Sequence, residues 1–256
     1  MFGPRFNAKT ETRSLVLRSV EPQDLQNLPT QPDPAITQYL SEKTKSSLAG
    51  LYAHRERSDH YTWWRTGRDR VIWGIFDRAS NTETLLGYTG IIAAANDSSS
   101  SEGWHEAESF MVLFEPEHRG KGLARTTHPY RSSFAFAIGV DCLRSSVVIE
   151  NERSINALRG AGYLLIGQAR QDEEGFRRYQ FRQYAPEVGE YALTHAIASA
   201  KHLQIQSPMI DHNDVLVSQG YTRALGVAFP EVQEAATQWL QEAGNQLVYL
   251  PNGRTT

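Results

Sequence analysis

The chain has 256 residues, of which 40% are hydrophobic, and it carries a formal net charge of −3. This length suits one large domain, or an ordinary domain with a small one, and the apolar content excludes wholesale disorder. The slightly acidic balance gives no global reason to expect a nucleic-acid binder. Cys142 is the only cysteine, which excludes an intramolecular disulfide and a thiolate metal cluster.

The start of the chain, MFGPRFNAKTETRSL, lacks the apolar core of a signal peptide. The longest apolar runs, near 91–95 and 110–114, are too short to span a bilayer. We therefore expect a soluble, cytoplasmic protein that does not bind membranes.

In chain order, the pattern predicts a polar tail to about residue 12, a strand at 14–20, and one or two surface helices within 23–70. Further on it predicts strands at 70–77, 85–95, 108–115 and 143–150, helices after 122 and at 151–163, and a closing hairpin that ends with 176–184. Hairpins at both ends with one strand–helix–strand unit between them indicate a mixed α/β fold. Its sheet is mostly antiparallel, with a parallel centre, and helices flank it.

Residues 186–256 form a second segment, which we expect to be a small helical extension of a domain that spans 13–184. Turn and breaker residues predict helix stops at Pro208, Gly220, Gly226 and Pro230.

The stretch FEPEHRGKGLARTTHPY, 114–130, places two glycines and several basic residues where a strand becomes a helix. A Walker-type phosphate loop needs Ser or Thr after Gly-Lys, but Gly122 follows Lys121, so that interpretation fails. A dinucleotide fingerprint is weak, because Arg125 stands where its third glycine should be.

Arg119-x-x-Gly122-x-Ala124 matches the R/Q-x-x-G-x-G/A pattern of the GNAT superfamily of N-acetyltransferases. Downstream, NERSINALRGAGY resembles the N-x-x-S…G-F/Y segment of that family. The opening TRSLVLRSVEPQDL is similar to the branch that acetylates the N-termini of ribosomal proteins. Together these stretches carry the resemblance over roughly residues 13–184.

A physical reason supports a cofactor phosphate at this turn. A helix N-terminus leaves N–H groups unpaired and carries a positive partial charge, and glycine lets the backbone close on a pyrophosphate. Arg119, Lys121 and Arg125 add positive charge nearby. Pro129 lies inside the helix that follows, where we expect a bend or a late helix start.

The resemblance implies acetyl-CoA as co-substrate. It implies that the backbone of Val112, Leu113 and Phe114 pairs with the pantetheine arm, and that Asn151 binds the arm or its thioester end. The backbone N–H groups that would hold the pyrophosphate belong to Gly120, Lys121, Gly122, Leu123, Ala124 and Arg125, beside Arg119.

Acetyl transfer to an amine needs a base, because an α-amine titrates at about 7.7–8.0 and lysine at about 10.4. Glu106 and Glu108 share one face of the predicted strand and are the candidate general bases, with Glu150 as a rival. For each, an ordinary exposed strand-end charge is the alternative.

Many relatives carry a Tyr acid seven residues after the Asn, where this chain has Leu158. In the ribosomal branch the Ser of N-x-x-S is a candidate acid or thiol-orienting group, and here it is Ser154. A role for Ser154 as a cap partner in the first helical turn is the alternative.

The segment 54–70 interleaves basic residues with Tyr61, Trp63 and Trp64. It is either a lid that favours an acidic or nucleic-acid-like acceptor, or an amphipathic helix with a Trp core. No His pair has metalloprotease spacing, and Trp104-His105-Glu106 is a weak metal pattern, so we expect no metal.

We therefore expect direct acetyl transfer, in a ternary complex, to a primary amine, with a protein N-terminus as the leading acceptor. A small amine, an antibiotic or an aminoacyl-tRNA is the alternative acceptor, and a non-catalytic acyl-CoA-binding module is the alternative class. Residues 212–244 faintly resemble the helical tail of tRNA nucleotidyltransferases, whereas a helical cap or homodimerisation element is the plainer interpretation.

Overall fold

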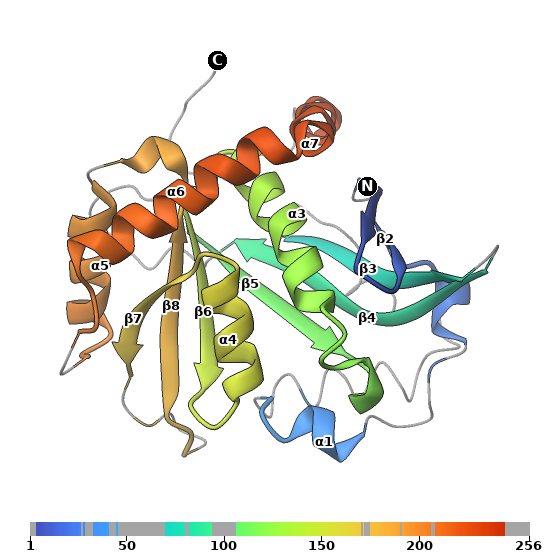
Figure 1. Cartoon of the computed structure of the whole chain (residues 1–256), viewed down its shortest axis with the longest axis horizontal. Coiled ribbons are helices and arrows are strands. Elements are labelled where there is room, and N and C mark those ends of the chain that lie inside the picture. Colours follow the sequence, from blue (N-terminus) through green and yellow to red (C-terminus); the bar gives the residue numbers. More distant parts are fainter. Residues whose placement is uncertain are drawn as a thin grey trace. The chain divides into compact units, whose positions relative to one another are not determined.

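The computed structural model describes residues 4–26, 28, 33–40, 45, 70–79, 82–93, 106–169, 171, 175–189, 191–205 and 208–243 (Figure 1). The chain divides into two compact units. The first unit comprises Met1–Gly90 and Phe110–Thr127, and the second comprises Ile91–Ser109 and His128–Thr256. The predicted mixed α/β fold, with a mostly antiparallel sheet and one parallel pair, is confirmed.

In the first unit the strands follow in the order β1-β2-β3-β4-β5. Antiparallel pairing joins β1 to β2 and β2 to β3. Strand bounds are β1 Phe6–Lys9, β2 Ser14–Arg18, β3 Arg70–Ala79, β4 Thr82–Ala93 and β5 Glu106–Leu113, and the short helices are η1 Pro22–Leu25, α1 Pro34–Thr37 and η3 Pro116–His118.

The prediction of a polar tail up to residue 12 was wrong for its second half. β1 pairs with β2 from Phe6, opposite Leu17, to Lys9, opposite Ser14. Phe6 and Ala8 are buried while their neighbours are exposed, so β1 has the alternation of a half-buried strand. Four residues are too few for this period to stand out among polar neighbours.

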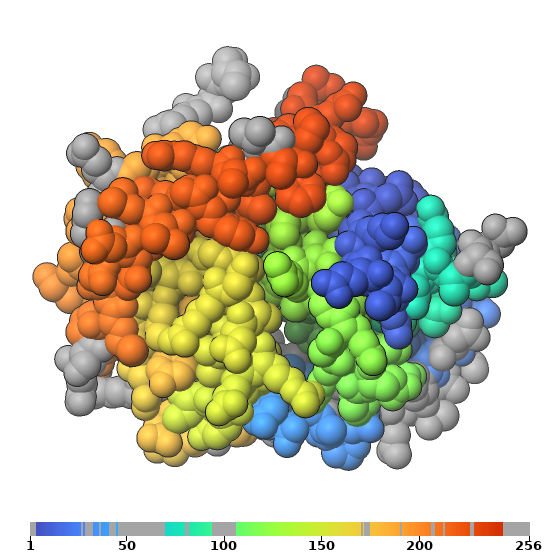
Figure 2. Space-filling view, in the orientation of Figure 1, coloured from blue at the N-terminus to red at the C-terminus, as the bar shows by residue number. Residues whose placement is uncertain are grey.

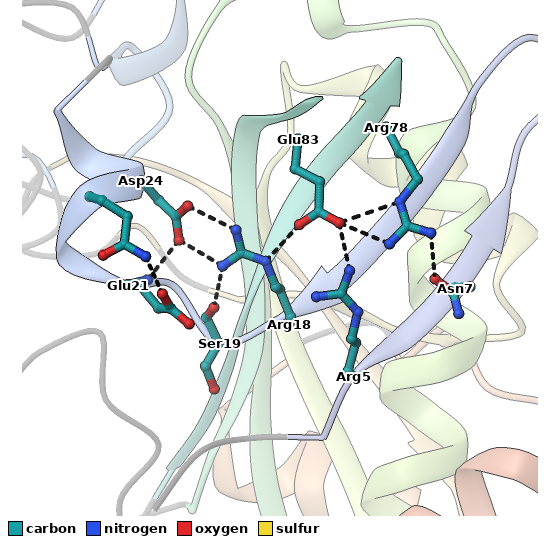
Figure 3. Close-up of polar contacts among 9 residues, drawn as sticks. Arg5, Asn7, Arg18, Ser19, Glu21, Asp24, Arg78 and Glu83 are labelled. Atoms are coloured by element: carbon teal, nitrogen blue, oxygen red, sulfur yellow. Dashed lines mark hydrogen bonds and ion pairs between the residues drawn. The ribbon is translucent and has the colours of Figure 1, made fainter. Parts of the chain in front are cut away.

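An ionic network centred on Glu83 of β4 joins β1, β2 and β3 (Figure 3). Its carboxylate contacts Arg5 at 2.5 Å, Arg18 at 2.8 Å and Arg78 at 2.9 Å. Arg18 also pairs with Asp24 at 2.7 Å. The network ties the N-terminal strand to the hairpin of β3 and β4.

In the second unit the strands follow in the order β5-β6-β8-β7. β5 and β6 are parallel, while β8 runs antiparallel to both β6 and β7. The bounds are β6 Cys142–Val148, β7 Leu164–Gln168 and β8 Arg178–Tyr184, with helices α3 Leu123–Ala137, whose first turn belongs to the first unit, and α4 Glu152–Gly160.

The C-terminal segment is helical, as predicted, with η4 Pro186–Val188, α5 Tyr191–His202, α6 His212–Ala228 and α7 Pro230–Ala243. The predicted stops at Gly220 and Gly226 were wrong, because both residues lie inside α6. A glycine inside a helix costs only about 1 kcal/mol, which packing readily outweighs. None of the described helices is long and apolar enough to cross a membrane.

Contacts within the second unit hold this helical segment against strands and helices that precede it in the chain. The Ser218 hydroxyl donates to the Gly162 carbonyl at 2.6 Å, at the turn that follows α4. Trp239 of α7 packs edge-on against Phe134 of α3 at 5.7 Å between ring centroids. Figure 2 shows the surface of α6 directly beside that of α4.

Candidate active site

The turn before α3 is built on two glycines in the left-handed region. Gly120 has a φ of +72° and Gly122 a φ of +76°, which L side chains rarely adopt. A Cβ atom at either position would meet nothing within 4 Å. The turn is therefore open on its outer side, and conformation, not crowding, is what requires glycine there.

Backbone N–H groups gather at this turn. The first hydrogen bond of α3 runs from the Thr126 N–H to the Gly122 carbonyl, at 3.0 Å. Among the described residues, no N–H group from Gly120 to Arg125 donates a hydrogen bond. A row of unpaired N–H groups at a helix N-terminus is a ready site for an anion.

The basic side chains around the turn differ in their roles. The Arg119 guanidinium donates to the Ala35 carbonyl at 2.6 Å and so ties the turn to α1. Lys121 and Arg125 are exposed. Arg119 thus has a structural contact that the sequence did not indicate, and the exposed positive charge comes from the other two residues.

Beyond Glu108, successive residues of β5 direct their backbone N–H and C=O groups alternately toward β4 and away from it. The Phe114 N–H donates to the Leu86 carbonyl at 3.0 Å, and the Phe110 carbonyl accepts from the Thr89 hydroxyl at 2.8 Å. Both partners lie in β4, so the alternation of a strand directs the polar groups of Met111 and Leu113 the other way. Among the residues predicted to pair with pantetheine, Leu113 thus directs its backbone groups away from β4, where a ligand could pair with them. The Phe114 N–H, in contrast, already donates to the Leu86 carbonyl.

Asn151 begins α4 as its N-cap. Its side-chain oxygen accepts from the Ser154 backbone N–H at 3.3 Å, a weak version of the usual cap. Ser154 is therefore a cap partner through its backbone, while its hydroxyl makes no hydrogen bond within the described part of the chain. The Asn151 side-chain amide group and the Ser154 hydroxyl both remain available for a ligand.

The two candidate bases have different surroundings. Glu106 is contacted by Arg144 at 3.5 Å, Arg182 at 3.8 Å and His195 at 3.4 Å. Glu108 is exposed, and its carboxylate has no hydrogen bond or ion pair to any of the described residues. Of the two, only Glu108 has an uncommitted carboxylate.

A buried polar pair lies on the opposite face of β5. Ser109 and Tyr163 share a hydrogen bond of 2.6 Å between their hydroxyls. The ring of His128 stands edge-on to Tyr163 at 6.0 Å, and burial followed by the charge of Arg131 holds the pKa of His128 well below its usual value. A neutral His128 and this hydroxyl pair join β5 to the segment after α4.

Sequence reasoning missed Arg144, Arg182 and His195 as neighbours of Glu106. The strand alternation places each Arg on a face but does not show which strands become neighbours. The segment 54–70, interpreted above as either an acceptor-site lid or an amphipathic helix with a Trp core, lies outside the described residues except Arg70.

Two groups of side chains bring potential metal-ligand atoms within 4.8 Å of one another. They are Glu106 with Cys142 and His195, and Glu115 with Glu117 and His118. In the first group, the guanidiniums of Arg144 and Arg182 already lie beside the Glu106 carboxylate, so their positive charge would repel a divalent cation. In the second group, Glu117 and burial raise the pKa of Glu115. We assign no metal to either group.

The open turn before α3, with its unpaired N–H groups, suits an anionic ligand. Residues 14–164 match the profile of the Acetyltransferase (GNAT) domain family. This match spans more than half of the chain, which therefore belongs to the GNAT family of acetyltransferases. The chain is accordingly an acyl-CoA-dependent N-acetyltransferase, with acetyl-CoA as co-substrate.

Solved structures are similar to this chain at low identity. A domain from Methanocaldococcus jannaschii shares 17% identity over 69% of this chain and 99% of its own, with a TM-score of 0.49. A GNAT-family acetyltransferase from Bacillus anthracis shares 14% identity over 70% of this chain and 98% of its own, with a TM-score of 0.48. Spermidine N-acetyltransferase from Vibrio cholerae was solved with CoA and spermine. It shares 18% identity over 66% of this chain and 95% of its own, with a TM-score of 0.48. A search of curated proteins found no match.

Proposed function

We propose that this enzyme transfers the acetyl group of acetyl-CoA to a protein N-terminal α-amine by direct attack in a ternary complex. The similarity of the segment 12–25 to the ribosomal-protein branch supports this acceptor. We further propose that residues 13–184 form the acetyltransferase domain and that residues 186–256 extend it.

The unpaired N–H groups from Gly120 to Arg125 carry the cofactor part of the proposal. Six backbone donors on an open turn, with Lys121 and Arg125 exposed beside them, suit the two charges of a pyrophosphate. Gly122 in place of Ser or Thr removes the magnesium ligand of a nucleotide loop, so the turn is suited to coenzyme A.

The pantetheine arm would then extend along β5 as an added strand. The parallel ladder between β5 and β6 covers only Glu106–Glu108, opposite Cys142–Arg144. Beyond it, Met111 and Leu113 direct their backbone groups away from β4, and these are the groups we assign to the arm. Asn151 would bind the arm through its side-chain amide group.

In the reaction, the lone pair of the amine attacks the thioester carbonyl carbon, a C–N bond forms, and the C–S bond breaks. The proton that the amine loses goes to Glu108, whose exposed carboxylate has no partner among the described residues. The departing thiolate takes a proton from water, either directly or through the Ser154 hydroxyl, which regains its proton from that water. Leu158 stands where many relatives have a Tyr acid, which leaves Ser154 as the candidate acid.

Calorimetry with acetyl-CoA on Gly122→Glu tests the cradle. A carboxylate on the open turn repels the pyrophosphate, so we expect affinity to fall by at least about tenfold. Gly139→Glu is the matched control, because Gly139 also has a positive φ, +92°, and a Cβ there would also meet nothing within 4 Å. The control introduces the same charge and a similar strain after the end of α3.

The control variant should bind acetyl-CoA like the parent protein. Equal affinities for Gly122→Glu and the parent would remove the phosphate cradle from the proposal. Equal losses in both variants would show that strain, not phosphate contact, governs binding.

A further inference from the structure

Two rows of side chains lie across β5, β6 and β8, on the face that carries both candidate bases. In the first row, Glu106 stands opposite Cys142, and Cys142 stands opposite Tyr184. In the second row, Glu108 stands opposite Arg144, and Arg144 stands opposite Arg182. Residues two apart in a strand point to the same side, so all six side chains share this face.

Both guanidiniums in the second row turn toward the first row. Arg144 reaches the Oε2 atom of Glu106 at 3.5 Å, and Arg182 approaches the Oε1 atom at 3.8 Å. Neither contacts Glu108, although each occupies the same row as Glu108. The carboxylate of Glu106 thus holds two cations that share a row with Glu108, and Arg144 is the one directly opposite Glu108.

His195, from α5 of the C-terminal segment, completes the surroundings of Glu106. Its Nε2 atom lies 3.4 Å from Oε1 of Glu106, and its Nδ1 atom lies 3.2 Å from the Tyr184 hydroxyl. Burial, with smaller contributions from neighbouring groups, raises the pKa of Tyr184 well above its usual value. The hydroxyl therefore keeps its proton and can donate it to Nδ1, which leaves Nε2 as the donor toward Glu106.

We propose that Glu106 is a positioning residue that draws Arg144 and Arg182 away from Glu108, and that His195 holds Glu106 in place for this task. The proposal rests on the proposed function, in which Glu108 takes the proton of the amine. A base that pairs with a guanidinium is weaker, because the cation stabilises its ionised form. Glu106 therefore keeps Glu108 available for catalysis, and the C-terminal segment contributes to the active centre through His195.

The test compares pH profiles of kcat/KM, with acetyl-CoA and a peptide α-amine, for the parent, Glu106→Gln and Glu106→Gln/Arg144→Gln. In Glu106→Gln the released Arg144 turns to Glu108, so we expect kcat to fall roughly 10–30-fold. The acid limb of the profile should move to lower pH, because the paired carboxylate stays ionised there. Removing Arg144 as well should return the limb toward its original pH and recover most of kcat.

Two further variants sharpen the test. Glu106→Asp keeps the charge and should retain most of the activity, and His195→Gln should move the profile in the same direction as Glu106→Gln but less. Glu187→Gln, which removes an exposed carboxylate elsewhere in the second unit, should match the parent.

An acid limb that stays in place in Glu106→Gln, or an equal loss in the single and double variants, would overturn the proposal. Glu108→Gln separates this failure from failure of the proposed function. If Glu108→Gln keeps full activity, Glu108 is not the base and both proposals fall. If it loses activity while the Glu106 variants behave as structural lesions, only the positioning role falls.

Discussion

Glu83 and Glu106 are both strand carboxylates with three basic neighbours, but their contacts differ in length. Glu83 contacts Arg5, Arg18 and Arg78 at 2.5, 2.8 and 2.9 Å. The contacts of Glu106 with Arg144, Arg182 and His195 measure 3.5, 3.8 and 3.4 Å. The first set has hydrogen-bond lengths, whereas the second consists of longer electrostatic contacts.

The difference in contact length distinguishes a structural ion-pair network around Glu83 from a looser group of charges around Glu106. Glu83 sits where three strands of the first unit must be joined, and direct hydrogen bonds suit that purpose (Figure 3). Around Glu106, Arg144 and Arg182 share a row with Glu108 but contact Glu106, and from this arrangement we infer the positioning role. We therefore expect changes at Glu83 to affect stability and changes at Glu106 to affect catalysis.

The largest stability effect should follow from Glu83→Gln. Losing the carboxylate leaves Arg5, Arg18 and Arg78 without their shared partner, and Arg18 keeps only Asp24 as a carboxylate partner. After allowance for solvent screening, we expect the free energy of unfolding to fall by about 1–2 kcal/mol. Urea unfolding measures this change, and kcat of the folded protein should be unchanged.

Glu106→Gln is the matched comparison. Its neighbours Arg182 and His195 are buried, so this variant should also lose stability, but unlike Glu83→Gln it should reduce kcat. If Glu106→Gln left kcat unchanged, or if Glu83→Gln impaired it, the distinction between the two networks would be wrong.

A smaller, pH-dependent effect on stability should follow from the same network around Glu83. Burial would raise the pKa of Glu83, but hydrogen bonds from Arg18, Arg78 and Arg5 outweigh it and hold the pKa at about 2, below its ordinary 4.5. A depressed folded-state pKa contributes stability above the unfolded-state value, and that contribution is lost as pH falls toward 2.

The stability difference between the parent and Glu83→Gln should therefore be largest above about pH 5 and should lose roughly half or more of its value by pH 3. Urea unfolding of both proteins at pH 7, 4 and 3 measures this trend. A difference that stayed constant over this range would show that Glu83 gains no stability from its charge.

The sequence predicted the order of the main strands and helices because hydrophobic alternation and turn residues are local signals. It also located the turn at Gly120 and Gly122, where positive φ angles require a residue type that can be read directly. It missed β1, which has only four residues, and it placed false stops at Gly220 and Gly226, where packing overrides propensity.

The surroundings of Glu106 could not be read from the sequence, because they depend on the neighbours of β5. Arg144, Arg182 and His195 lie far apart in the chain and meet only through the parallel ladder and the packing of α5. Likewise, only the hydrogen bonds of Phe110 and Phe114 show that Met111 and Leu113 face away from β4.

The most direct test of the proposed function is release of free coenzyme A thiol from acetyl-CoA with a panel of amines, including peptides with a free α-amine, peptides with only a lysine ε-amine, and spermidine. We predict release with the α-amine peptides, abolished by blocking their N-termini and reduced roughly 100-fold or more in Glu108→Gln. Release only with spermidine or the lysine peptides would contradict the protein N-terminal acceptor. Tight binding of acetyl-CoA without thiol release from any amine would contradict the catalytic role itself.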